Sequence, residues 1–152
     1  AKYTGTRLDE AATLRRGDIE KALRSGELHL RNTKGGRERY VPLTTEAKDV
    51  LREAIRDVKP GEYVYVPQGE AVHVWKAEVQ NFLISARDGI QDIDRGQGQR
   101  GKITFHGLRH FYARETYRDL CRSGLSDRES RKILAERLGH GRIEITYVYV
   151  PK

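Results

Sequence analysis

The pair Gly35-Gly36 constrains the fold of this chain more than any other local feature. It lies between two runs of residues, Glu27 to Thr33 and Arg37 to Thr44, that read as strands. Two successive glycines tolerate the positive φ angles of a tight turn, so the pair is a strong hairpin signal. The sequence therefore predicts one antiparallel β-hairpin with Lys34 beside its tip.

Segments with helical spacing of apolar residues surround this hairpin. The expected helices are Arg7–Leu14, a helix that Thr44 or Thr45 caps and Pro60-Gly61 ends, Val74–Arg87, His106–Cys121, and a helix that Ser126 caps and Gly139 ends. The residues expected to face inward in the third of these helices are Val79, Phe82, Leu83 and Ala86. Together the elements predict an α+β fold that is mainly helical with a small antiparallel β-sheet.

The remaining segments carry weaker signals. Gly17-Asp18 is typical of a turn, and Tyr63–Val66 is expected to be a short strand or an extended piece. Gly89 to Lys102 is polar and glycine-rich, which indicates a loop. The β-branched and aromatic tail from His140 to Lys152 leaves its local structure open.

The segment from Gly96 to Gly101 matches the Gly-x-Gly-x-x-Gly pattern of dinucleotide-binding proteins. That pattern has meaning only after a strand and at the start of a helix. Here charged residues precede it, and the strand-like segment Ile103-Thr104-Phe105 follows it. We therefore expect a loop rather than a nucleotide site.

The bulk composition describes one basic, globular domain. The chain has 152 residues with a net charge of +7, and 29 lysines and arginines are spread through segments that look folded. A basic excess of this kind favours a polyanionic partner such as nucleic acid. No apolar run is long enough for a bilayer, and a single cysteine, Cys121, excludes an internal disulfide.

Four short motifs carry the functional information. They are Thr4-Gly-Thr-Arg7-Leu-Asp-Glu10, the hairpin Thr33–Leu43, His106-Gly-Leu-Arg109-His110, and Leu138-Gly-His140 followed by Thr146 and Tyr149. In this order they resemble the first-arginine, lysine-hairpin, His-x-x-Arg and Leu-Gly-His-to-tyrosine boxes of the tyrosine recombinases, the phage integrase family. The resemblance covers almost the whole chain and implies the DNA breaking and rejoining catalytic fold of that family.

The resemblance implies a role for each of six residues. Arg7 and Arg109 would hold the phosphate, and planar guanidinium groups suit its developing negative charge because they stay protonated and donate in pairs. His106 would transfer a proton at the nucleophile, and His140 would donate a hydrogen bond to the phosphate. Lys34 would protonate the departing 5′ oxygen, with Arg37 as the rival cation.

The nucleophile implied by the resemblance is Tyr149 rather than Tyr147. Tyr149 lies nine residues after His140 and three after Thr146, as in the family pattern, whereas Tyr147 has neither spacing. In an extended segment both tyrosine side chains would point to the same side, so local geometry would not separate them. A tyrosine with an ordinary pKa near 10 is only about one part in a thousand ionised at neutral pH, so a cationic pocket and a nearby base are needed.

Other residues are expected to support this set. Glu10 lies one helical turn from Arg7 and could orient either Arg7 or His106. His110 is expected to pack behind the reacting groups, and the residues expected to contact DNA are Thr33, Arg37 and Lys102. His106 and His110 have a spacing that can bind zinc, but no Glu stands between them and Cys121 is distant, so no metal site is expected.

The resemblance implies metal-free, cofactor-free site-specific recombination through a 3′-phosphotyrosyl intermediate, as in integration or excision. The partner would be double-stranded DNA, on which the full-length enzyme would act as a homotetramer. The enzyme would work in the cytoplasm, and its gene would belong to a bacterium, an archaeon, a phage or another mobile element. Relatives have a DNA-clamping domain before the first box and a tail after the tyrosine. We therefore expect residues 1–152 to be the catalytic domain, which alone could be monomeric.

Three alternatives stand against this interpretation. A type IB topoisomerase would use the same chemistry without strand exchange. A non-catalytic DNA-binding module would have lost active-site residues, but all six are present. A basic structural or RNA-binding protein should show stacking aromatic residues in a strand motif, for which Tyr63 and Tyr65 are the only hint.

Overall fold

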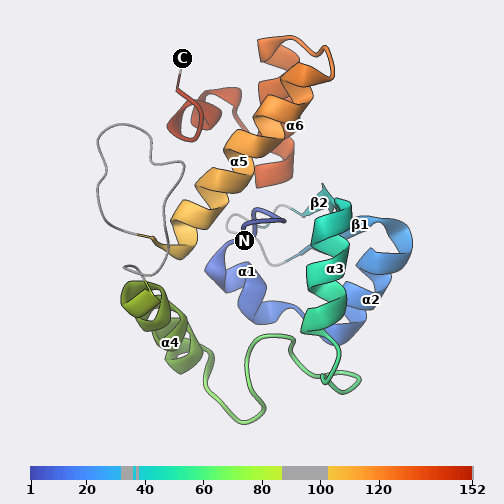
Figure 1. Cartoon of the computed structure of the whole chain (residues 1–152), viewed down its shortest axis with the longest axis vertical. Coiled ribbons are helices and arrows are strands. Elements are labelled where there is room, and N and C mark those ends of the chain that lie inside the picture. Colours follow the sequence, from blue (N-terminus) through green and yellow to red (C-terminus); the bar gives the residue numbers. More distant parts are fainter. Residues whose placement is uncertain (32–35, 37, 87–102, 152) are drawn as a thin grey trace.

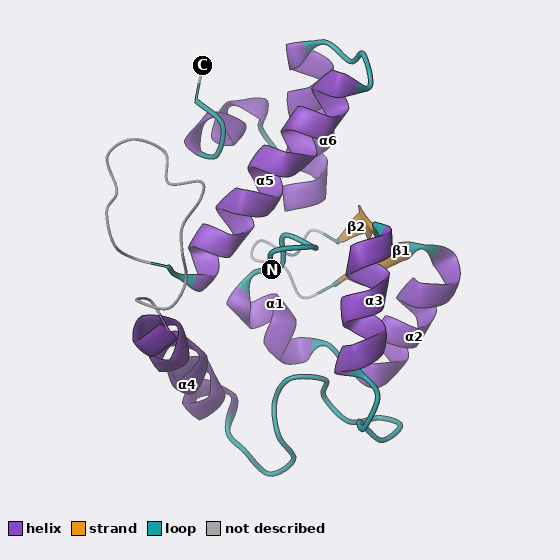
Figure 2. Cartoon of the chain, in the orientation of Figure 1, coloured by secondary structure: helices purple, strands orange, loops and turns teal. Residues whose placement is uncertain are grey.

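The computed structural model describes residues 1–31, 36, 38–86 and 103–151. Its elements are α1 (Leu8–Thr13), α2 (Arg16–Ser25), β1 (Glu27–Leu30), β2 (Arg39–Pro42), α3 (Thr45–Ala54), α4 (Val72–Ser85), α5 (Phe105–Arg122), α6 (Asp127–Leu138) and the 3-10 helix η2 (Ile143–Val148). Figures 1 and 2 show a mainly helical molecule with one small sheet. The expected α+β class, dominated by helices, is therefore confirmed.

The two strands pair antiparallel, as predicted for a hairpin. Leu28 lies opposite Val41 and Leu30 lies opposite Arg39, so these four side chains share one face of the sheet. All four are buried, whereas His29 and Tyr40 stack on the other face with ring centroids 4.3 Å apart. The buried face of the hairpin therefore brings an arginine into the interior.

The elements form two groups that meet where α6 packs on β2. Figure 1 shows α5 and α6 together at one end and the hairpin with α2 and α3 at the other. The main core joins both ends, and its fully buried members include Ile19, Leu28, Val41, Leu134 and Leu138. Each such side chain contributes about 1.5–3 kcal/mol by leaving water. A smaller cluster packs α1 against Trp75 of α4.

Helix caps explain where the later helices begin and end. Thr44 and Ser126 accept hydrogen bonds from the backbone N–H groups of Ala47 and Glu129, as expected for N-caps. The α6 helix ends at Gly139, whose φ of 69° is left-handed, and the N–H of His140 donates to the Ala135 carbonyl at 2.8 Å. This ending turns the chain sharply and places His140 at the end of α6.

The structure corrects four local predictions. Gly17-Asp18 is not a turn but lies in the first turn of α2, where Asp18 accepts a hydrogen bond from the Arg15 N–H. The helix that Thr44 caps ends at Ala54, before Pro60-Gly61. Tyr63–Val66 is not a strand, although Tyr63 forms an isolated bridge with Arg15.

The fourth correction concerns α4. Phe82 was expected to face inward, but its side chain is 67% exposed. Trp75 and Leu83 are buried and Val79 packs beside them, so the inward stripe follows an i, i+4 spacing from Trp75. Phe82 lies about 100° around the helix from Leu83, which turns it away from α1. None of the helices in the described ranges has the length and apolarity that a membrane span requires.

Candidate active site

Arg7 stands immediately before α1, in an extended backbone conformation with φ −77° and ψ 160°. Its guanidinium donates from Nη1 to Glu10 Oε1 at 2.7 Å and from Nη2 to the Leu138 carbonyl at 3.3 Å. Glu10 Oε2 also accepts the Arg7 backbone N–H at 2.7 Å. Glu10 was expected to orient either Arg7 or His106. In the structure it contacts Arg7 and holds that side chain at the start of α1.

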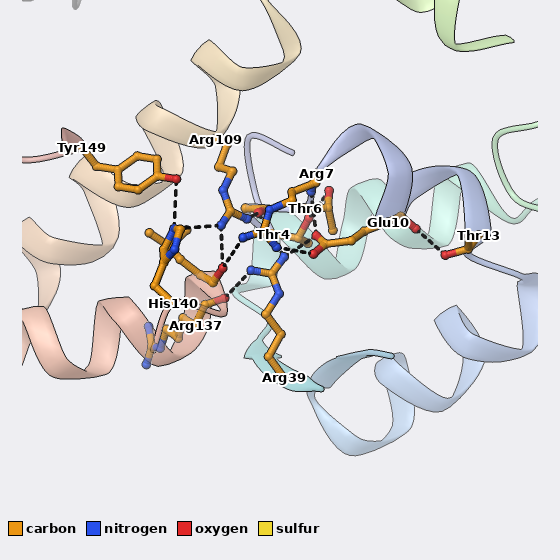
Figure 3. Close-up of polar contacts among 12 residues, drawn as sticks. Thr4, Thr6, Arg7, Glu10, Thr13, Arg39, Arg109, Arg137, His140 and Tyr149 are labelled. Carbon is orange, nitrogen blue, oxygen red and sulfur yellow. Dashed lines mark hydrogen bonds and ion pairs between the residues drawn. The ribbon is translucent and has the colours of Figure 1, made fainter. Parts of the chain in front are cut away.

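Arg109 lies on α5 and is 1% exposed. Its Nη1 donates to the Gly5 carbonyl, and its Nη2 donates to the Leu138 carbonyl at 2.5 Å. Arg7 and Arg109, which are 102 residues apart in the sequence, therefore share one carbonyl acceptor at the end of α6. Figure 3 shows the two guanidinium groups beside each other, as expected for groups that bind one phosphate.

A third arginine, Arg39, belongs to the same cluster and was not among the residues expected from the sequence. It enters from the buried face of β2, donates from Nη2 to Glu10 and to the Gly5 carbonyl, and donates from Nη1 to the Arg137 carbonyl at 2.9 Å. Strand alternation could have found it, because Arg39 shares its face with the buried Val41. Figure 3 shows Arg39 opposite Arg7, with Glu10 between them.

Gly5 supplies the carbonyl that Arg39 and Arg109 share. Its φ of 59° is left-handed, and a Cβ atom there would lie 2.5 Å from Cδ1 of Tyr112. No side chain could occupy that space without a shift of the buried tyrosine ring. Only glycine therefore allows the backbone to approach α5 closely enough to hold both guanidinium groups.

Tyr149 lies at the C-terminal end of η2 and is 6% exposed. Its hydroxyl is 3.0 Å from His140 Nε2, and the same nitrogen is 3.5 Å from Arg109 Nη2. The Tyr149 ring centroid lies 5.9 Å from Arg109 Cζ. The predicted nucleophile, one predicted histidine and one predicted arginine are therefore in contact, as Figure 3 shows.

Tyr147 points elsewhere because the segment is a 3-10 helix rather than an extended strand. Two residues along a 3-10 helix turn the side chain by about 240°, so Tyr147 and Tyr149 do not share a side. The ring centroid of Tyr147 lies 3.9 Å from Arg131 Cζ, so this tyrosine packs on the guanidinium of α6. The geometry thus separates the two tyrosines, although an extended segment would not have done so.

His106 and His110 lie one turn apart near the start of α5, with Nε2 atoms 3.1 Å apart. Thr104 caps this helix by accepting the Gly107 N–H at 2.9 Å, which fixes the first turn that carries His106. The Tyr149 ring centroid is 4.6 Å from that of His110 and 6.1 Å from that of His106. Both imidazoles therefore lie against the predicted nucleophile, with His110 packed directly on its ring.

The three histidines resist protonation. Burial, together with the charges of Arg109 and Arg7, lowers the pKa of His140 to about 4. Burial and the neighbouring His106 lower the pKa of His110 to about 4, and burial with Arg109 and Arg7 also lowers the pKa of His106. At neutral pH, His140 and His110 are therefore uncharged, and His140 Nε2 can accept a hydrogen bond from the Tyr149 hydroxyl.

The cluster is strongly cationic even with neutral histidines. Burial lowers the pKa of Arg39 to about 10, an effect that Glu10 opposes and Arg109 and Arg7 reinforce, so Arg39 stays charged at neutral pH. Three guanidinium groups face one carboxylate, an excess of two positive charges. Beside them is a cavity of about 550 Å³, and its lining includes Arg7, His106 and Arg109. An anion such as a phosphodiester would complete the charge balance.

Some expected site residues cannot be placed. Thr33, Lys34, Arg37 and Lys102 lie outside the described residues, as does the glycine motif from Gly96 to Gly101. Their roles stay predictions. Within the described ranges, no group of three or more His, Cys, Asp or Glu side chains could hold a metal ion.

The model of the phage integrase family matches residues 1–152. The chain belongs to the phage integrase family. Among curated relatives, it is 26% identical to the TnP I resolvase of Bacillus thuringiensis over 147 residues, which is 97% of this chain and 45% of the relative. Members of this family are tyrosine recombinases, in agreement with the resemblance of the four motifs.

Several solved structures share the fold of this chain. The XerA recombinase has a TM-score of 0.64 at 22% identity over 99% of this chain and 50% of that protein. The Tn1549 transposon integrase bound to circular intermediate DNA has a TM-score of 0.62 at 19% identity, over 99% of this chain and 52% of that one. The catalytic domain of bacteriophage HP1 integrase is 26% identical, with a TM-score of 0.51, over 97% of this chain and 68% of that one.

The chain spans about half the length of the TnP I resolvase, the XerA recombinase and the Tn1549 integrase that it matches. This integrase-family fold therefore corresponds to one part of those longer proteins.

Proposed function

We propose that this integrase-family chain is the catalytic domain of a tyrosine site-specific recombinase, which breaks and rejoins double-stranded DNA without a metal or cofactor. The observation that carries the proposal is the contact of the Tyr149 hydroxyl with neutral His140, beside two guanidinium groups that share the Leu138 carbonyl. A poor nucleophile, a proton acceptor and a cationic phosphate site are thus assembled from three distant parts of the chain.

The proposed cleavage step forms one bond and breaks one. The Tyr149 oxygen attacks the phosphorus, the bond from phosphorus to the 5′ oxygen breaks, and a 3′-phosphotyrosyl ester remains. Arg7 and Arg109 stabilise the negative charge that grows on the non-bridging oxygens, and each charge-assisted hydrogen bond contributes about 1.5–3 kcal/mol. Lys34 protonates the departing 5′ oxygen. A 5′-hydroxyl from a partner duplex later reverses the step, so the ester conserves the bond energy.

Two imidazoles are candidates to accept the proton of Tyr149. The family resemblance assigns this role to His106, whereas the hydroxyl contacts His140 Nε2 at 3.0 Å. The ring centroid of His106 lies 6.1 Å from that of Tyr149, whereas the ring centroid of His110 lies only 4.6 Å from it. We propose that neutral His140 accepts a hydrogen bond from the Tyr149 hydroxyl until a phosphate enters the site, that it then donates to the phosphate, and that His106 accepts the Tyr149 proton during the attack.

The partner that we propose is duplex DNA carrying a recombination site, handled in the cytoplasm by a homotetramer of the full-length protein. The Tn1549 transposon integrase, which shares this fold, was solved in complex with transposon right-end DNA. The net charge of +7 on this chain and the cationic excess of its site support an anionic partner of the same kind.

The proposal is tested by trapping the covalent intermediate. The full-length protein that carries this chain is incubated with nicked duplexes tiled across the DNA on either side of its gene. The nick lets the short fragment with the 5′-hydroxyl diffuse away, so the ester accumulates. We expect a complex that resists SDS, is lost on protease digestion and leaves a free 5′-hydroxyl.

Paired tyrosine variants identify the nucleophile. Tyr149→Phe should abolish the complex, while Tyr147→Phe, which keeps the ring that packs on Arg131, should retain it. A complex that survives Tyr149→Phe and disappears with Tyr147→Phe would refute the assignment. The absence of any complex with the unaltered protein on every duplex would refute the enzymatic proposal.

A further inference from the structure

Arg131, in the middle of α6, is one of the most buried charged residues of the chain, with a side chain only 3% exposed. Its Nε donates to Asp127 Oδ1 at 2.8 Å, one turn earlier on the same helix. Its Nη1 donates to the Val150 carbonyl at 2.9 Å and to Thr146 Oγ1 at 3.4 Å. A single guanidinium therefore joins α6 to residues on both sides of Tyr149.

Two aromatic rings complete the surroundings of this guanidinium. The ring centroid of Tyr147 lies 3.9 Å from Arg131 Cζ, and that of Tyr117 on α5 lies 4.9 Å away. Both distances are within the range of cation–π attraction, which is strongest where water is excluded. None of these groups lies among the residues that surround the predicted phosphate site, so the cluster has no part in the proposed chemistry itself.

The contacts of Arg131 bracket the nucleophile in sequence. Thr146 is three residues before Tyr149 and Val150 is one residue after it, and the Tyr149 N–H donates to the Thr146 carbonyl at 3.0 Å. Because Arg131 fixes both Thr146 and Val150, the backbone of Tyr149 has little freedom to move. Thr146 is itself fully buried and donates to the Ile143 carbonyl at 2.6 Å, which closes the turn from the other side.

The same helix carries the other side of the Tyr149 contact. Leu138 is seven residues after Arg131, two turns along the same face of α6, and its carbonyl holds Arg7 and Arg109. His140 follows directly on the left-handed Gly139. Helix α6 thus sets the distance between Tyr149 and His140, because Arg131 in its middle holds the tyrosine segment and His140 follows its C-terminus.

We propose that Arg131 is the positioning residue that holds Tyr149 on its own subunit in the attacking position. It acts through Thr146, Val150 and the ring of Tyr147, without touching the reacting atoms. The inference rests on the proposed function, since it assigns Tyr149 as the nucleophile. It predicts that loosening this clamp slows formation of the phosphotyrosyl ester and leaves DNA binding unchanged.

The decisive variants are Arg131→Met, which keeps the length of the side chain and removes its charge and donors, and Arg131→Lys, which keeps the charge without the planar fork. We expect Arg131→Met to slow covalent trapping on the nicked duplex roughly tenfold or more, and Arg131→Lys to recover part of that loss. The affinity for the uncut duplex should stay within about twofold of the unaltered protein, because this buried side chain lies away from the phosphate site.

The matched control is Ser130→Ala, on the same helix. Ser130 is also fully buried and polar, but its hydroxyl faces Cys121 of α5, with 3.5 Å between Sγ and Oγ. A general loosening of α6 would slow trapping in both variants equally, whereas the clamp predicts an effect of Arg131→Met alone. Equal trapping rates for Arg131→Met and the unaltered protein would overturn the inference.

Amide hydrogen exchange of the DNA-free protein provides a readout that does not depend on catalysis. The N–H groups of Tyr149 and Val150 both donate to the Thr146 carbonyl, so they should exchange faster in Arg131→Met and at an unchanged rate in Ser130→Ala. Unchanged exchange in Arg131→Met would refute the clamp even if the protein had no enzymatic activity. Should Arg131→Met fail to fold, Arg131→Lys and Tyr147→Leu provide the same comparison.

Discussion

Glu10 is the acceptor on which two of the three clustered arginines depend. Its Oε1 accepts from Arg7, and its Oε2 accepts from the Arg7 backbone and from Arg39. The side chains of Glu10 and Arg39 are each 2% exposed, so neither charge can be satisfied by water. A buried charge whose partner is removed costs far more than an exposed one.

We therefore expect Arg39→Met to lower the free energy of unfolding by about 3 kcal/mol or more. The control is Arg52→Met, because Arg52 pairs with Asp49 at 2.6 Å but both side chains are more than half exposed. Its loss should cost under about 0.5 kcal/mol. Urea denaturation followed by circular dichroism measures both. Similar small losses in the two variants would show that Arg39 does not support Glu10.

At the scale of elements, α6 is the helix on which the candidate site is built. Its last two carbonyls, of Arg137 and Leu138, accept from all three arginines, and its terminal glycine turns the chain toward His140. Helix C-termini leave such carbonyls unpaired, and cationic groups there also interact favourably with the helix dipole. The guanidinium groups therefore act as the C-terminal cap of α6.

A Gly139→Ala variant tests the role of the C-terminus of α6. A Cβ atom at Gly139 would lie 3.0 Å from Arg39 Cδ, and its φ of 69° is unfavourable for alanine. Gly124 is the matched control, since its φ is 93° but no other atom lies within 4 Å of its Cβ position. Both alanine variants should lose about 1–2 kcal/mol of stability from backbone strain.

Only Gly139→Ala should also reduce covalent trapping on the nicked duplex, because it displaces Arg39 and the start of the His140 turn. Thermal unfolding and the trapping assay separate the two effects. Trapping that falls equally in Gly124→Ala would mean that general loss of stability, rather than the geometry of the α6 terminus, explains the defect.

At the scale of the whole molecule, the site lies where the two groups of elements meet. Arg39 comes from β2 of the hairpin, Arg109 comes from α5, and the Gly5 carbonyl accepts hydrogen bonds from both of them. The polar cluster therefore belongs to the contact between the two ends, and folding of the whole chain is needed to form it.

Protonation of the half-buried His110 and His140 should weaken the folded state in acid. His110 and His140 have native pKa values of about 4 against an ordinary 6.5, so below pH 6.5 the unfolded chain binds protons that the native protein excludes. Stability should therefore fall between pH 6.5 and pH 4, and carboxylates add to the loss near the acidic end.

Replacing His110 with glutamine removes one of these groups, so the loss of stability on going from pH 7 to pH 5 should become smaller. Denaturant unfolding at both pH values measures the difference, with exposed His73→Gln as the control. An unchanged pH dependence in His110→Gln would contradict the neutral state of this imidazole.

Local physical chemistry made much of the fold predictable. The hairpin pairing, the cap at Ser126 and the helix end at Gly139 depend on a few neighbouring residues and were predicted. For the helix that begins at Thr45, the sequence predicted a cap at Thr44 or Thr45, and the structure has Thr44. Predictions failed where local signals were ambiguous. Gly17-Asp18 has the composition of a turn, yet it lies in the first turn of α2, where Asp18 accepts the Arg15 N–H. Phe82 is as apolar as the buried Leu83 beside it, yet it lies on the exposed side of α4.

The sequence by itself determined the family, because the four motifs keep their order and spacing whatever the tertiary contacts. It also singled out Tyr149 over Tyr147 by spacing. Only the tertiary structure decided which groups meet, since the hydrogen bonds of Arg39 span 29 to 98 residues and the carbonyls that hold the arginines leave no mark in the sequence. The gathering of three arginines around Glu10, and the clamp of Arg131 on the tyrosine segment, arise from packing that no short stretch of residues encodes.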